Sequence, residues 1–187
     1  MGAAPSGCDA TTNMASEPQL AVGMWVAMMA MMMLPGAAPA ALRADRKLPF
    51  FAIYFTAWAG FGVACAGLQF FLESRHTLTQ GLALSNDATA GILLIGIGAY
   101  ELTPWKHAFL QACRASQAHG RPYSLACLGA AWALMGTLFV AGVMNYVWVA
   151  LLALWIAAEK SLSWGSALAS VAGIGFIIWG GVKLLVV

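Results

Sequence analysis

The chain has 187 residues, of which 61% are hydrophobic and only 9% are charged, and its mean hydropathy is +0.80. Soluble domains carry about 25% charged residues, so this composition argues against a water-facing globular domain and makes the lipid bilayer the expected partner. The formal net charge of +2 is small and its bases are scattered, so no nucleic-acid partner is expected.

The N-terminal segment, residues 1–19, is small and polar and has no Lys or Arg. A secretory signal peptide needs a positively charged start, so we predict a disordered tail there. Residues 20–42 are then apolar over the full length of a membrane-spanning helix and are stopped by the bases of residues 43–47. We therefore expect this segment to be retained as a membrane anchor.

Five more apolar segments follow the first, and together they predict an all-α, polytopic bundle of about six transmembrane helices. The bundle would form a single domain, 20–187. The later helices are expected at 49–72, 88–102, 123–142, 145–158 and 164–187. Asn145 is expected to cap the helix at 145–158.

The basic residues predict how this bundle lies in the membrane. With six spans, seven of the nine Lys and Arg residues would fall in the first, third and fifth loops, on one side. The positive-inside rule then places those loops in the cytoplasm and both termini outside.

Methionine is concentrated in the first helix, where Met24 to Leu34 contains six of the ten in the chain. Met29 and Met33 are four positions apart and so share one helical face. Thioethers are soft ligands that suit copper(I). Methionine also fills irregular gaps between helices, so the same pattern is expected of an ordinary packed core, and both readings stay open.

A second helix is predicted in the third loop, over residues 104–117. Thr103 followed by Pro104 is typical of a helix start, and apolar residues recur on one side of the segment. This pattern predicts an amphipathic helix parallel to the membrane surface, with Trp105 and Phe109 buried and Lys106 exposed.

That helix brings Cys113 back toward Cys127, fourteen residues later. Two thiols meeting there are candidate copper(I) ligands, alone or together with Met33 or His107. Unpaired cysteines are also common as small buried hydrophobic residues. We expect no disulfide framework in a membrane chain with four cysteines.

Few acids lie near the predicted spans. Glu101 is one turn inside the end of a short span and is expected to meet Lys106 or His107, whereas Glu159 beside Lys160 is consistent with a solvated pair. The sequence contains no nucleophile–base arrangement and no phosphate-binding loop, so we predict no catalytic residues and no enzyme activity.

Four blocks of the sequence, in this order, resemble a bacterial family of predicted metal-binding integral membrane proteins. The blocks are WVAMMAMMMLPGAAPA, ELTPWKHAFLQACR, CLGAAWALMGTLFVAGVMN and AAEK. The resemblance covers about residues 22–160. It is a family with a domain of unknown function, sometimes labelled copper chaperone, and it implies a location in the bacterial inner membrane.

The resemblance carries Cys113 and Cys127 over as candidate ligands, with Pro35, Pro39 and Pro104 as structural markers. Departures from the family pattern are Phe109, Ala130 and Ala131, where cysteine is usual, and Ala112, where histidine is frequent.

Two functions follow from this sequence. The first is copper(I) handling at the cytosolic face, for which the predicted metal ligands are Cys113, Cys127, Met29, Met33 and His107. The alternative is a non-catalytic structural or assembly subunit of a larger membrane complex with a degenerate metal site, favoured by abundant small residues that let helices approach closely.

Overall fold

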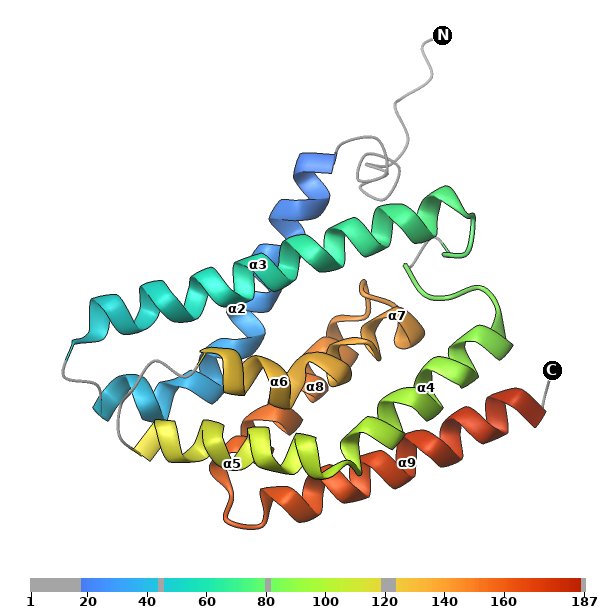
Figure 1. Ribbon diagram of the computed structural model, residues 1–187. Helices are drawn as coiled ribbons and strands as arrows, with labels where there is room; N and C mark the ends of the chain where they lie inside the picture. Colours follow the sequence, from blue (N-terminus) through green and yellow to red (C-terminus); the bar gives the residue numbers. More distant parts are fainter. Residues whose placement is uncertain (1–17, 44–45, 80–81, 119–123, 186–187) are drawn as a thin grey trace, which may run out of the picture.

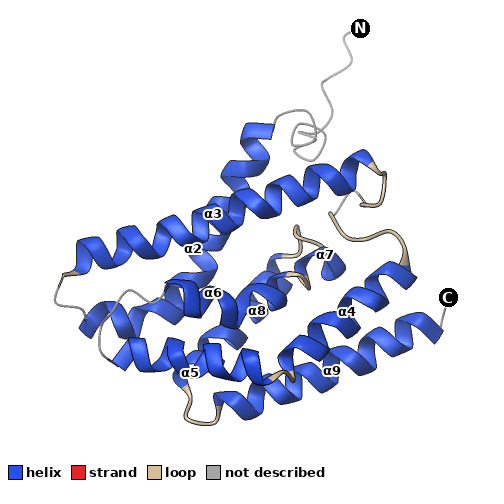
Figure 2. Cartoon of the chain, viewed as in Figure 1, coloured by secondary structure: helices blue, strands red, loops and turns tan. Residues whose placement is uncertain are grey.

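A computed structural model describes residues 18–43, 46–79, 82–118 and 124–185. Within these ranges the chain is helical, and the only β-type pairing is an isolated antiparallel bridge between Leu78 and Leu84 (Figures 1 and 2). The helices are α2 (Pro18–Arg43), α3 (Lys47–Ser74), α4 (Asp87–Glu101), α5 (Pro104–Ala118), α6 (Ser124–Met135), α7 (Leu138–Ala141), α8 (Tyr146–Ser161) and α9 (Gly165–Leu185). The predicted all-α fold class is confirmed.

Most helix boundaries are close to those predicted, and polar caps set the starts of α4, α5 and α8. The side chain of Asn145 accepts a hydrogen bond from the backbone N–H of Trp148 at the start of α8, and Asn86 does the same for α4. At α5 the hydroxyl of Thr103 accepts from the N–H of Lys106. Each oxygen satisfies a backbone donor that the first turn of a helix leaves without an internal partner.

The prediction of about six spanning helices is wrong for the described residues. Three helices, α2, α3 and α9, are long and apolar enough to cross a membrane. The fourth predicted span is interrupted after Met135, where a turn separates α6 from the four-residue α7. Helices α4 and α8 have 15 and 16 residues, less than the roughly 20 that a bilayer crossing needs.

The predicted disordered tail, 1–19, lies outside the described residues except for Pro18 and Gln19, which begin α2. Helix α2 is bent where Figure 1 shows it passing behind α3. It contains Pro35 and Pro39, and proline is a common cause of helix bending because it cannot donate a backbone hydrogen bond.

Glycine brings α4 and α9 into close contact, side by side in Figure 1. A Cβ atom added at Gly98 would lie 2.5 Å from the carbonyl oxygen of Gly173, and one added at Gly180 would lie 2.6 Å from that of Gly91. The two backbones therefore touch at two levels, which only small residues allow.

The main hydrophobic core lies instead among α2, α3, α5, α6 and α8, and large side chains fill it. Trp25 of α2 donates a hydrogen bond from Nε1 to Oε1 of Gln69 on α3, at 2.6 Å. Tyr54 and Trp58 of α3 belong to the same core and are almost completely buried. This core contains four of the five candidate ligands, namely Met29, Met33, Cys113 and Cys127.

Candidate functional site

Cys113 of α5 and Cys127 of α6 form a disulfide, with their Cα atoms 5.0 Å apart. Both side chains are fully buried. The two sulfurs therefore converge, as predicted. The expectation of no disulfide is wrong for this pair. Cys65 on α3 is free and buried, as expected of a small apolar side chain, and Cys8 lies outside the described residues.

Met29 and Met33 lie on the buried side of α2, in the same core cluster as the disulfide. We call the four residues Met29, Met33, Cys113 and Cys127 the sulfur site. The hydroxyl of Tyr54 on α3 donates to the carbonyl oxygen of Met33 at 2.9 Å, so it ties this turn of α2 to its neighbour. Four of the five predicted ligands thus belong to one core.

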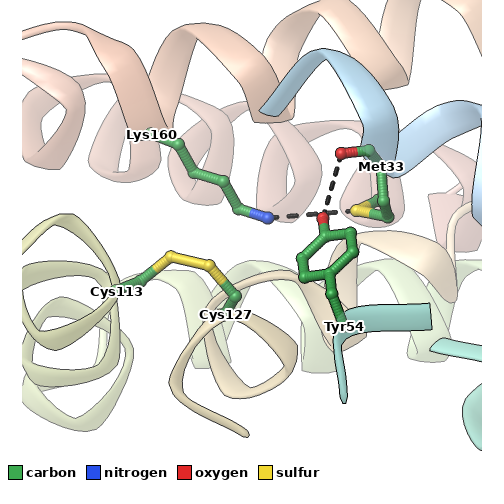
Figure 3. Close-up of a disulfide and its surroundings, with 5 residues drawn as sticks. All are labelled: Met33, Tyr54, Cys113, Cys127 and Lys160. Carbon is green, nitrogen blue, oxygen red and sulfur yellow. Dashed lines mark hydrogen bonds between the residues drawn. A yellow bond between two sulfur atoms is a disulfide. The ribbon is translucent and has the colours of Figure 1, made fainter. Parts of the chain in front are cut away.

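Lys160 of α8 reaches into the sulfur site (Figure 3). Its Nζ lies 3.9 Å from the Sδ atom of Met33 and 5.6 Å from the ring centroid of Trp58. Gly36 on α2 makes room for this side chain, because a Cβ there would be 3.3 Å from the Cδ of Lys160. The Lys160 amine thus lies beside the Met33 sulfur and over an aromatic face.

Glu101, Lys106 and Glu159 form a second buried group, which we call the charged cluster. The Nζ of Lys106 lies 2.5 Å from Oε2 of Glu101 and 3.1 Å from Oε2 of Glu159. All three side chains have an exposed fraction of 2% or less. The ion pairs join the end of α4, the start of α5 and the end of α8.

The charged cluster confirms one expectation and corrects two. Glu101 meets Lys106, as expected. Glu159 and Lys160 are buried rather than solvated, because both point into the bundle from the last turns of α8.

The other correction concerns the register of α5. A helix is present over the predicted segment, but Lys106 is fully buried while Trp105 is 72% and Phe109 38% exposed. The inward face consists of Lys106, Leu110 and Cys113, spaced four and three residues apart. The carboxylates that hold Lys106 inside come from α4 and α8, and this turns the helix about its axis by roughly one position.

His107 is not part of the sulfur site as we define it. It lies six positions before Cys113 on α5, which corresponds to about 120° around the helix, and its side chain is half-buried. The part of the chain that the structure describes contains no group of three or more His, Cys, Asp or Glu residues able to hold a metal ion. A metal site here would therefore depend on thioether sulfur in addition to the two cysteines.

Sequence reasoning did not find Lys160, Glu159 or Tyr54 as parts of a site. Scarcity was the available signal: with 9% charged residues in the chain, any charge inside an apolar helix is a candidate for a buried pair. No sequence pattern pointed to Tyr54, because its hydroxyl donates to a backbone carbonyl on a different helix.

The model of a family described as "Copper chaperone" matches residues 22–183. This range includes every residue of the sulfur site and of the charged cluster. No curated protein and no solved structure matches the chain.

Proposed function

We propose that this chain, which belongs to the copper chaperone family, binds copper(I) at Cys113 and Cys127 in their reduced form. One observation carries the proposal: two cysteines from different helices meet inside an apolar core that also contains Met29 and Met33. Thiolate and thioether sulfur together favour copper(I) over harder ions.

Copper loading would first require the disulfide to be reduced, with two electrons and two protons from a dithiol giving two thiols and an oxidised dithiol. Copper(I) then displaces both thiol protons and forms a bis-thiolate complex of net charge −1. Met33 would supply a thioether near this complex, and the nearby Lys160 ammonium would offset its charge. The ion is the protein's cargo in this proposal.

We also propose that the protein is embedded in the bacterial inner membrane, with α2, α3 and α9 crossing the lipid. Support comes from their length and apolar composition and from large hydrophobic side chains that face outward, among them Phe71, Ile92, Leu154 and Ile178. The positive-inside rule supports placing the basic residues between α2 and α3, Arg43, Arg46 and Lys47, in the cytoplasm, with copper handled at that face. Three crossings then put the two termini on opposite sides of the membrane, so the arrangement with both termini outside, which six spans implied, is not retained.

Copper content of the purified protein tests the metal proposal. After reduction with dithiothreitol and incubation with copper(I), we expect the unaltered protein and a Cys65→Ser variant to retain copper through gel filtration. Cys65 is the matched control because it is also buried but unpaired. The double variant Cys113→Ser with Cys127→Ser should retain none.

Methionine substitutions sharpen this test. Met33→Leu should weaken copper(I) binding roughly tenfold, the order of second-shell effects on metal affinity, because the thioether is lost while the volume is kept. Met31→Leu is the control, since Met31 lies on the same helix but is 73% exposed. Failure of the unaltered reduced protein to retain copper would overturn the proposal in favour of a structural or assembly subunit.

A further inference from the structure

The charged cluster holds more negative than positive charge. Lys106 is shared between two carboxylates, and among the described residues neither carboxylate forms another salt bridge. Lys160 directs its Nζ toward Met33 and Trp58 instead. Because an uncompensated charge inside an apolar interior is costly, one proton is the simplest way to balance this cluster.

The hydrogen bonds decide which carboxyl group takes that proton. Glu159 accepts from Lys106 at Oε2 and from the indole Nε1 of Trp155 at Oε1, at 2.9 Å. Glu101 accepts from Lys106 alone, and no described residue donates to its Oε1 atom. Hydrogen bonds donated to a carboxylate stabilise its ionised form, so Glu101, which accepts fewer of them, is the carboxyl group that keeps the proton.

The surroundings of Glu101 keep water away and add no charge. Helix α9 presents Gly173, where an added Cβ would lie 3.1 Å from the Cβ of Glu101. Lys106 and Glu159 are the charged residues that α5 and α8 direct at it. Helices α6 and α7, which also pack on α4, contain no Asp, Glu, Lys, Arg or His.

We propose that Glu101 is a proton-binding site, neutral when Lys106 is paired with Glu159 and ionised when its proton leaves. Proton loss would place a second negative charge against Lys106 at the junction of α4, α5 and α8. Protonation therefore controls the electrostatic contact between these three helices, which gives the protein a proton-linked step that does not rest on copper binding.

Infrared spectroscopy of copper-free protein in dodecyl maltoside micelles, a detergent without carbonyl groups, tests this site directly. The carbonyl stretch of a protonated carboxyl group should be present in the unaltered protein at neutral pH and absent in Glu101→Gln. Glutamine has nearly the size of the neutral acid, so this variant should fold. Glu73→Gln is the matched control, because Glu73 accepts a hydrogen bond from Gln69 but lies outside the charged cluster.

Two results would overturn the proposal: no such band in the unaltered protein at neutral pH, or a band that persists in Glu101→Gln. A second measurement separates a proton site from a merely structural pair. The thermal midpoint of the unaltered protein should fall as the pH is raised and Glu101 ionises, while that of Glu101→Gln should change less over the same range. Equal pH dependence in both proteins would also contradict the proposal. Both measurements use disulfide-bonded, copper-free protein, so their outcome is independent of the copper test.

Discussion

The charged cluster and the surroundings of the sulfur site both include residues of α5 and α8. The contacts that a buried lysine makes differ between the two regions. In the charged cluster, Lys106 lies 2.5 and 3.1 Å from the carboxyl groups of Glu101 and Glu159. Beside the sulfur site, the Lys160 amine of α8 lies against a thioether and an aromatic ring, without a carboxylate within salt-bridge distance among the described residues. Two adjacent residues, Glu159 and Lys160, thus serve two different environments.

Lys106 therefore stabilises the contact between helices, whereas Lys160 is placed to act on chemistry at the sulfur site. A buried cluster of three residues from three helices fixes how those helices meet, and removing Lys106 leaves the charge of Glu159 without a partner. A lysine beside soft, neutral sulfurs contributes little to the contact between helices. It is instead well placed to balance a negative complex formed there.

The largest expected effect is that of Lys106→Met. The buried Glu159 carboxylate would lose its cation and Glu101 would lose its hydrogen-bond donor, so we expect a loss of about 3–5 kcal/mol in the free energy of unfolding. Lys160→Met is the comparison, because Lys160 has no carboxylate within salt-bridge distance among the described residues, and its effect should be much smaller. Unfolding by sodium dodecyl sulfate, followed by circular dichroism, measures both. Equal losses would mean that the two regions do not differ in the way described.

The next effect concerns the disulfide of the sulfur site. Replacing Cys113 and Cys127 together by alanine opens a link between residues 14 apart, so we expect a loss of about 3 kcal/mol by the loop-closure relation. The same unfolding assay under non-reducing conditions applies. Cys65→Ala, which changes one buried unpaired thiol, should cost clearly less, and similar losses in the two proteins would contradict a stabilising cross-link.

Much of the fold could be predicted because its signals are local. Apolar runs interrupted by Asn, Pro and basic residues placed the helix ends within a few residues, and Asn145 caps α8 as expected. The number of spans could not be predicted in the same way. Whether residues 123–142 form one long helix depends on the turn after Met135, and α4 is short because the chain turns at Thr103 to start α5.

The candidate site, too, could be predicted only where its signals are local. The convergence of Cys113 and Cys127 followed from a helix that leads back toward the next one. The orientation of α5 did not, because amphipathic patterning assumes that lysine faces water, whereas Lys106 finds its second carboxylate on Glu159, 53 positions away. Contacts at such separation leave no periodic signal in a single sequence.

The smallest expected effect tests how each region is enclosed. Tyr54 and Trp58 surround the sulfur site, whereas glycine lets α9 cover the charged cluster. A Cβ at Gly173 would lie 2.9 Å from the carbonyl oxygen of Gly98 and 3.1 Å from the Cβ of Glu101.

Gly173→Ala should therefore force α9 away from α4 and cost about 1–3 kcal/mol, the usual range for overpacking. Gly175→Ala is the control two positions away, where an added Cβ meets nothing within 4 Å. Alanine there should be neutral or should stabilise α9 by up to about 1 kcal/mol through its higher helix propensity. Thermal unfolding of the two variants in detergent gives the comparison. If Gly173→Ala were as stable as Gly175→Ala, α4 and α9 would have space for a methyl group next to Glu101. Glycine at position 173 would then not be required for α9 to cover the charged cluster.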